Sequence, residues 1–261
     1  MALADEYDGF LIDLDGVVWV GRELIPGAAE ALRELGERGT AFVFVTNNPG
    51  RPGSVYADRL REAGVEVGAD RIVTAGESTA QLAAELAGPG ASAFVIGADA
   101  FHQAVAAAGL ELRDGEPARQ ADIVVVSGHR GFDYEELLTA TLALRTGAKL
   151  VATSRDPTLP MPDGPWPGTG AVLAAVETAS GARAEIGGKP EHHLFDLARR
   201  RLGTGAGRVA MVGDRVASDI EGGRRAGLGT VLVLSGATAG EDEAAASGAD
   251  HVIDDLAGLL G

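Results

Sequence analysis

The chain has 261 residues, of which 22 are Lys or Arg and 38 are Asp or Glu, so its formal net charge is −16. This negative charge argues against nucleic acid or an anionic membrane as a partner, because both bind basic surfaces. Cysteine is absent, which excludes disulfide bonds, thiolate nucleophiles and zinc held by cysteine. We find no apolar segment of membrane-spanning length and no signal peptide at the start of the chain, and therefore expect a cytoplasmic protein.

Short apolar runs alternate with segments of helical character along the chain. Seven runs are apolar throughout, as is typical of strands buried on both faces of a parallel sheet. They span residues 9–13, 41–46, 93–97, 123–127, 150–153, 209–213 and 230–234. Helices are predicted between them, among others at residues 26–38, 52–63, 134–145 and 190–201. This order predicts an α/β fold with a Rossmann-like, mainly parallel sheet.

Most of the candidate carboxylates lie near residues 13 and 214, with little candidate chemistry at the strand ends between Ser78 and Gly181. The segment 155–170 holds five prolines and has no periodicity. It is too long for a routine loop, so we interpret it as a functional segment or a domain edge. We therefore predict a split core of residues 1–77 and 181–261, interrupted by an inserted domain of residues 78–180.

Polar residues follow several predicted strands directly, where ligands bind in open α/β sheets. The set comprises four carboxylates, one hydroxyl, two amides and one ammonium: Asp13, Asp15, Asp214, Asp219, Thr46, Asn47, Asn48 and Lys189. Each residue alone also has a structural interpretation, such as a tight Asp-Gly turn, helix capping by Asp214 or a solvated Lys189. Their joint occurrence in this order favours one functional site.

The chemistry of this set suits phosphate esters. Clustered carboxylates repel one another unless a cation compensates them, and carboxylate oxygens are ligands that suit Mg²⁺. Asp13 can act as a nucleophile, since carboxylates form aspartyl-phosphates. Asp15 can then protonate the leaving group and later activate water. Most of the rate of phosphoryl transfer comes from positioning and charge neutralisation, which Lys189 would supply together with the metal.

These residues form four motifs that resemble those of the haloacid dehalogenase superfamily of phosphatases. The motifs are Asp13-Leu-Asp15-Gly-Val, Thr46-Asn47, Lys189 and Gly213-Asp214-Arg-Val-Ala-Ser-Asp219. The resemblance covers nearly the whole chain. The insertion between the second and third motifs is similar to the α/β cap of the NagD-like, class IIA phosphatases. The resemblance therefore implies a haloacid dehalogenase core with an inserted cap.

The resemblance also implies a role for each matching residue. Asp13 would be the nucleophile and a Mg²⁺ ligand, and Asp15 the general acid and base, binding Mg²⁺ through its backbone carbonyl. Asp214 would complete the metal ligands, with Asp219 as their supporting partner. The phosphoryl group would be held by Thr46, Asn47 and Lys189. The substrate would be a small phosphorylated metabolite: glycerol phosphate, phosphoglycolate, a sugar phosphate, a nucleotide or an aryl phosphate.

The inserted domain departs from the family pattern at two places. Relatives often carry Asp where His129 stands, and Asn is commoner at or near Ser154. Because the cap sets substrate choice, the substrates of relatives cannot simply be transferred. The candidates for substrate contact in the cap are His129, Arg130, Arg155 and Asp156. Relatives often dimerise through the cap, so a homodimer is expected.

Two other classes of protein compete with a phosphatase. A signalling phospho-acceptor domain also combines acidic residues, Thr and Lys around Mg²⁺, but its acceptor Asp lies on a central strand. A non-catalytic phosphate-binding protein on the same fold is the second alternative. The intact set of Asp13, Asp15, Lys189 and Asp214 argues against it.

Overall fold

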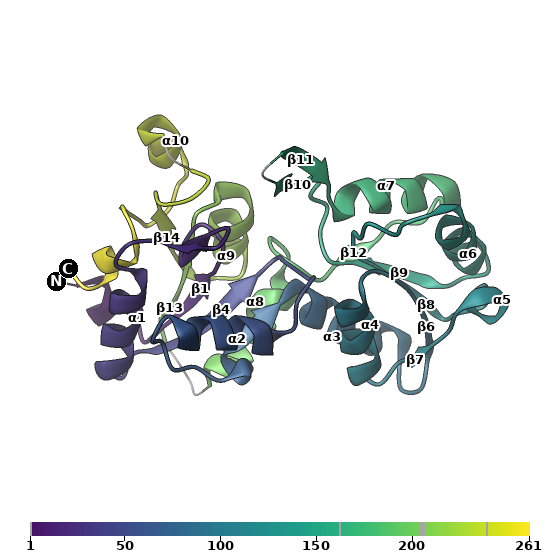
Figure 1. Ribbon diagram of the computed structural model, residues 1–261, viewed down its shortest axis with the longest axis horizontal. Coiled ribbons are helices and arrows are strands. Elements are labelled where there is room, and N and C mark those ends of the chain that lie inside the picture. Colours follow the sequence, from purple (N-terminus) through teal and green to yellow (C-terminus); the bar gives the residue numbers. More distant parts are fainter. Residues whose placement is uncertain (1, 162, 204–206, 239) are drawn as a thin grey trace. The chain divides into compact units, whose positions relative to one another are not determined.

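A six-stranded sheet lies at the centre of the first of two units into which the chain folds (Figure 1). The structure is a computed structural model that describes residues 2–161, 163–203, 207–238 and 240–261. The first unit comprises Met1–Thr46, Gly53–Val73 and Lys189–Gly261. The second comprises Asn47–Pro52 and Thr74–Gly188.

The strand order in the first unit is β15-β14-β13-β1-β4-β5. The bounds are β1 Gly9–Asp13, β4 Ala41–Thr46, β5 Ile72–Thr74, β13 Val209–Gly213, β14 Gly229–Val233 and β15 His251–Ile253. Because β1 pairs in parallel with both β4 and β13, the carboxyl ends of these three strands meet at one edge of the sheet. The predicted strands 9–13, 41–46 and 209–213 are confirmed to the residue. β5 and β15 were not predicted, because three residues are too few to form a recognisable pattern.

Helices and short turns complete the first unit. The helices are α1 Ala28–Glu37, α2 Gly53–Glu62, α8 His192–Leu202, α9 Glu221–Arg225 and α10 Glu241–Ala246. The turns are the 3₁₀ segments Leu3–Asp5, Ala69–Arg71 and Leu256–Leu259 and the π-helical turn Val216–Ile220. A small hairpin, β2 Trp19–Val20 with β3 Glu23–Leu24, follows β1. α1 buries Ala28, Leu32 and Leu35, a spacing that forms one helical face toward the core.

The second unit contains a five-stranded sheet in the order β12-β9-β8-β6-β7. Its strands are β6 Ser92–Ile96, β7 Glu111–Leu112, β8 Ile123–Val126, β9 Lys149–Ala152 and β12 Glu185–Ile186. Its helices are α3 Ala75–Ala87, α4 Asp99–Ala107, α5 Gly115–Ala118, α6 Tyr134–Arg145 and α7 Thr169–Ser180. The ladders are parallel, so the predicted α/β fold with mainly parallel sheets is confirmed.

Helices cover both faces of this second sheet, as the strand residues require. Val124 and Val126 pack into one apolar cluster with side chains of α6 and α7. Ile123 and Val125 pack into another cluster with side chains of α3 and α4. Alternate residues of β8 therefore face opposite helical layers, which explains why the run is apolar throughout.

The proline-rich segment 155–170 forms an antiparallel hairpin of β10 Thr158–Met161 and β11 Gly164–Pro167. Prolines are tolerated there because the hairpin stands apart as a two-stranded sheet, where each strand has one unpaired side. A functional role of the segment stays a prediction.

The compact units divide the chain near, but not at, the domain boundaries expected from the sequence. A boundary after residue 77 would cut α3, which begins at Ala75 and packs on β8 and β9. β12 pairs with β9, which carries the chain up to Gly188 into the second unit. Within the described residues, no helix is both long and apolar enough to cross a membrane.

Candidate active site

Three carboxylates converge at the carboxyl ends of β1 and β13. Asp13 is the last residue of β1, Asp214 directly follows β13, and Asp219 lies in the π-helical turn after it. One oxygen from each lies within 4.8 Å of the other two, and all three side chains are buried. The parallel pairing of β1 with β13, in register from Gly9 with Val209, brings the strand ends together.

A buried lysine lies among these acids. The Nζ of Lys189 lies 2.9 Å from Asp13 Oδ2 and 2.7 Å from Asp219 Oδ1, and the residue is 3% exposed. Burial alone would lower the pKa of Lys189, but the charges of Asp13 and Asp219 more than offset this and raise it above its ordinary value. The lysine therefore stays protonated and neutralises part of the negative charge of the site.

Negative charge remains in excess at the cluster. Burial raises the pKa of Asp13 to about 8; Lys189 acts against this, while Asp219 and Asp214 act with it. Burial also raises the pKa of Asp214. Among the described residues, Asp214 Oδ1 is a buried oxygen without a hydrogen-bond partner. A divalent cation would reduce the repulsion among the carboxylates and would give Asp214 Oδ1 a partner. The donor set therefore fits Mg²⁺.

Asp219 orders the turn that follows β13. Its Oδ2 accepts a hydrogen bond from the backbone N–H of Arg215 at 3.0 Å, while Oδ1 faces Lys189. Asp214 does not cap this turn, since its Oδ2 accepts from the backbone N–H of Ala237 at 2.6 Å. The structural alternative of helix capping by Asp214 is therefore wrong.

The loop after β14 forms a wall of the site that sequence reasoning missed. Besides the Ala237 contact, Ser235 Oγ donates to the carbonyl of Gly16 at 2.8 Å. A Cβ on Gly16, which has a φ of +88°, or on Gly236 would lie 2.2 Å from Asp214 Oδ2. Only glycine fits at both positions, because any side chain would collide with the carboxylate. Small residues in a loop give little sequence signal, so only the position after a strand could have indicated them.

Asp15 lies apart from the three buried acids. It is exposed, and its Oδ1 accepts a hydrogen bond at 3.0 Å from the indole N–H of Trp19, a residue that sequence reasoning did not select. Binding of a metal by the Asp15 carbonyl stays a prediction. Thr46 is buried at the end of β4, and Val45 beside it is in register with Asp13.

Asn47 opens the short segment of the second unit that precedes α2. A Cβ on Gly188 would lie 2.8 Å from Asn47 Oδ1, so the carboxamide lies close to the backbone just before Lys189. Gly188 is therefore required for this approach.

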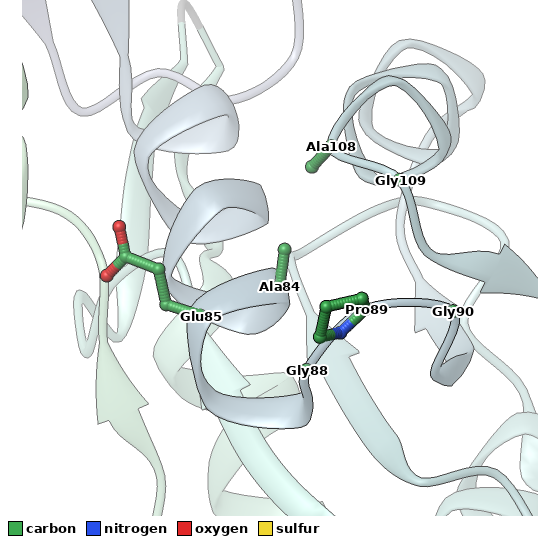
Figure 2. Close-up of a pocket in the computed structure, with 7 residues that line it drawn as sticks. All are labelled: Ala84, Glu85, Gly88, Pro89, Gly90, Ala108 and Gly109. Atoms are coloured by element: carbon green, nitrogen blue, oxygen red, sulfur yellow. The ribbon is translucent and has the colours of Figure 1, made fainter.

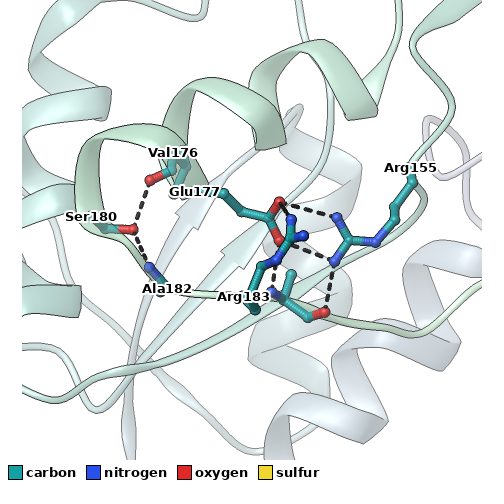
Figure 3. Close-up of polar contacts among 7 residues, drawn as sticks. Arg155, Val176, Glu177, Ser180, Ala182 and Arg183 are labelled. Carbon is teal, nitrogen blue, oxygen red and sulfur yellow. Dashed lines mark hydrogen bonds and ion pairs between the residues drawn. The ribbon is translucent and has the colours of Figure 1, made fainter.

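The four candidate contacts of the second unit lie in two places. His129 Nε2 lies 3.0 Å from a carboxylate oxygen of Glu136, and the guanidinium of Arg130 lies 4.0 Å from the centre of the Trp166 ring. Arg155 forms two hydrogen bonds with Glu177, as Figure 3 shows, and the Asp156 side chain is exposed. Arg155 is thus already held by a partly buried acid, whereas substrate contact by any of the four stays a prediction.

A surface groove of the second unit is a poorer candidate for phosphate chemistry. It lies between the ends of α3 and α4 and is lined by Ala84, Glu85, Gly88, Pro89, Gly90, Ala108 and Gly109 (Figure 2). The carboxylate of Glu85 points away from Pro89 and Ala108. These lining residues include no cationic side chain, so the groove offers nothing to hold a phosphate.

Comparison with known proteins agrees with the geometry of the carboxylate site. A family model described as haloacid dehalogenase-like hydrolase matches residues 10–111, and a second model of the same kind of hydrolase matches residues 186–259. A 5′-nucleotidase of Bacillus subtilis is 36% identical over 250 residues, which span 96% of this chain and 92% of that protein. The chain belongs to the haloacid dehalogenase-like hydrolase family.

Similarity to the glycerol phosphate phosphatase of a second organism also extends along most of this chain. The D-glycerol 3-phosphate phosphatase of Mycobacterium tuberculosis is 39% identical over 92% of this chain and 67% of its own length. A crystal structure of a glycerol phosphate phosphatase from the same organism, in complex with magnesium, superposes with a TM-score of 0.90. It is 35% identical and covers 99% of this chain and 78% of its own. The predicted family and the predicted enzyme class, a phosphatase, are confirmed.

Proposed function

We propose that this haloacid dehalogenase-like hydrolase is a Mg²⁺-dependent phosphatase that cleaves small phosphate monoesters through an aspartyl-phosphate on Asp13. The observation that carries the proposal is the buried cluster in which Lys189 Nζ contacts both Asp13 and Asp219, with Asp214 beside them. The three carboxylates exceed the one ammonium in charge, which favours binding of a cation. The ammonium and the cation can then bind a phosphate together.

The proposed reaction has two displacement steps at phosphorus. The Asp13 carboxylate attacks the phosphorus atom, the bond from phosphorus to the leaving oxygen breaks, and Asp15 gives a proton to that oxygen. Asp15, now deprotonated, takes a proton from a water molecule that attacks the aspartyl-phosphate. Inorganic phosphate leaves, and Asp13 and Asp15 return to their starting states.

The remaining residues bind and orient the phosphoryl group. Lys189 would donate to one of its oxygens, and Thr46 and Asn47 would donate to others. The residues that would hold Mg²⁺ are Asp13, Asp214 and the Asp15 carbonyl, with Asp219 supporting them through Lys189. When bound, the metal would neutralise charge on the phosphoryl oxygens.

The second unit is proposed as the cap that selects the alcohol or phenol part of the ester. His129, Arg130, Arg155 and Asp156 are its candidate contacts. The family members described above act on a nucleotide or on glycerol phosphate, which supports a phosphate monoester and leaves glycerol phosphate, phosphoglycolate, sugar, nucleotide and aryl phosphates as candidates. A homodimer through the cap and a cytoplasmic location remain predictions.

A panel of these phosphate esters tests the proposal. Phosphate release with Mg²⁺ present, compared as kcat/KM, is expected to give at least one substrate that turns over many times per protein molecule. The non-catalytic alternative, a phosphate-binding or phospho-acceptor protein, predicts binding or a single phosphorylation without turnover. One well-separated substrate would define a specialist, and similar values across the panel a generalist.

A further inference from the structure

The proposed general acid and base is held by a buried aromatic residue. Trp19 is fully buried, and its indole N–H donates to Oδ1 of the exposed Asp15 at 3.0 Å. The contact joins the second residue after β1 to the first residue of β2, four positions further along the chain.

The backbone between these two residues fixes their separation. The N–H of Gly16 donates to the carbonyl of Trp19 at 2.7 Å, and the N–H of Trp19 donates to the carbonyl of Leu14 at 3.2 Å. Gly16 permits the turn because its φ of +88° is strained for other residues. The loop therefore brings the indole back beside Asp15 through a hydrogen-bonded turn.

The indole ring also packs against two side chains of one helix. The guanidinium of Arg59 lies 3.9 Å from the ring centre, and the Tyr56 ring stacks on the indole with centroids 6.3 Å apart and planes inclined by 10°. Both residues belong to α2. Arg59 additionally donates to the carbonyl of Gly21 at 2.9 Å, which ties the hairpin to the same helix. The N–H of Trp19 thus has a defined direction.

We propose that Trp19 is a positioning residue that decides which oxygen of Asp15 carries the transferable proton. An indole nitrogen only donates hydrogen bonds, so Oδ1 is kept as an acceptor. The proton given to the leaving oxygen, and later taken from water, then resides on Oδ2. This proposal rests on the proposed function, because it explains how the general acid of that reaction, Asp15, is positioned.

A leaving-group comparison tests this role. An alkoxide needs a proton as it leaves, whereas 4-nitrophenolate leaves readily as an anion. Trp19→Phe keeps an aromatic ring beside Arg59 and Tyr56 but removes the donor. We expect its kcat/KM to fall about 10- to 100-fold for glycerol 3-phosphate, and by less than about threefold for 4-nitrophenyl phosphate. Equal losses for both esters would show that Trp19 acts only through stability, which overturns the proposal.

A second measurement leaves Trp19 in place and does not depend on activity. The chain has two tryptophans, Trp19 and Trp166, so its ¹⁵N-labelled indoles give two resonances, which Trp166→Phe assigns. In Asp15→Ala we expect the Trp19 indole proton to exchange with water at least about tenfold faster, with the Trp166 resonance unchanged. A Trp19 indole proton that exchanges at the same rate in wild type and Asp15→Ala would refute the hydrogen bond and the proposal with it.

The two experiments separate failure of this proposal from failure of the proposed function. A wild-type protein that releases no phosphate from any ester of the panel refutes the phosphatase and the role of Trp19 together. A wild-type protein that is active, with Trp19→Phe equally impaired on both esters, refutes only the role of Trp19.

Discussion

The Nζ of Lys189 lies 2.7 Å from Asp219 Oδ1, in a place where the two side chains are 2% and 0% exposed. Such a pair is costly to break, because the partner left behind is a buried charge without compensation. The cost of removing Lys189 is larger still, because Asp13 contacts the same ammonium at 2.9 Å and would also lose its partner. We therefore expect Lys189 to stabilise the folded site, in addition to its proposed role in binding the phosphoryl group.

Replacement of this lysine tests both roles. Without metal, Lys189→Met is expected to lower the free energy of unfolding by about 3–5 kcal/mol, because it leaves three buried acids facing one another. Urea unfolding measures the loss, and Mg²⁺ is expected to recover part of it. Lys149→Met is the matched control, because Lys149, the other lysine of the chain, is exposed and donates a hydrogen bond to the carbonyl of Leu86. Similar losses in the two variants would contradict the account.

The loop behind Asp214 gives a second test. A Cβ on Gly236 would lie 2.2 Å from Asp214 Oδ2, so Gly236→Ala must displace the carboxylate. We expect the Mg²⁺ concentration for half-maximal activity to rise about tenfold, the usual order for a disturbed support of a metal ligand. Gly36→Ala, in α1 with no atom near the added Cβ, controls for the change itself. An unaltered Mg²⁺ requirement in Gly236→Ala would remove Asp214 from the metal site.

The partly buried Glu177 of α7 predicts a pH dependence of stability. Hydrogen bonds from Arg155 lower the pKa of Glu177 to about 2, with the Ala184 N–H and Arg183 contributing (Figure 3). A carboxyl with a lowered pKa stabilises the folded state above its unfolded pKa of 4.5, and this stabilisation is lost as the pH falls toward 2. Because both arginines are exposed, we expect Glu177→Gln to cost only about 1–2 kcal/mol at pH 7.

Chemical denaturation at pH 7 and pH 3 measures this difference. The difference in the free energy of unfolding between wild type and Glu177→Gln should be smaller at pH 3 than at pH 7. Glu111→Gln provides the control, since its partner Arg113 lies 3.5 Å away and both side chains are exposed. A gap that is constant between the two pH values would mean that the charge of Glu177 contributes nothing.

Removal of divalent metal tests the fit of the carboxylate cluster to Mg²⁺. EDTA is expected to abolish phosphate release, and added Mg²⁺ to restore it. Mg²⁺ should also raise the melting temperature, because the ion binds the folded chain and relieves repulsion among Asp13, Asp214 and Asp219. The Asp214→Asn variant should lose most of that rise. Activity that survives thorough chelation would exclude the metal.

The sequence predicted those parts of the molecule that depend on local patterns. β1, β4 and β13 are uninterrupted apolar runs, and their parallel pairing brings Asp13 and Asp214 together as the strand-end rule implies. Lys189 was predicted beside them from its order in the chain. The contact of Lys189 with two acids at once, and not only with a phosphate, is a property of the folded cluster.

Other features depend on contacts that no local pattern encodes. Arg155 and Glu177 are 22 residues apart, and only the packing of α7 brings them together. The approach of Gly236 to Asp214 joins two loops after different strands. The Trp19–Asp15 hydrogen bond spans four residues, but it requires a turn at Gly16 whose direction the composition does not reveal. The small loop residues that complete the site therefore escaped prediction.

Asp13→Asn provides the most direct test of the central claim, because this change keeps the shape of the side chain and removes the nucleophilic carboxylate. Phosphate release from the best ester of the panel, with Mg²⁺ present, is the measurement. The account predicts a fall in kcat of about 10⁴-fold or more in a protein whose circular dichroism is unchanged. Substantial turnover by folded Asp13→Asn would contradict an aspartyl-phosphate at this residue.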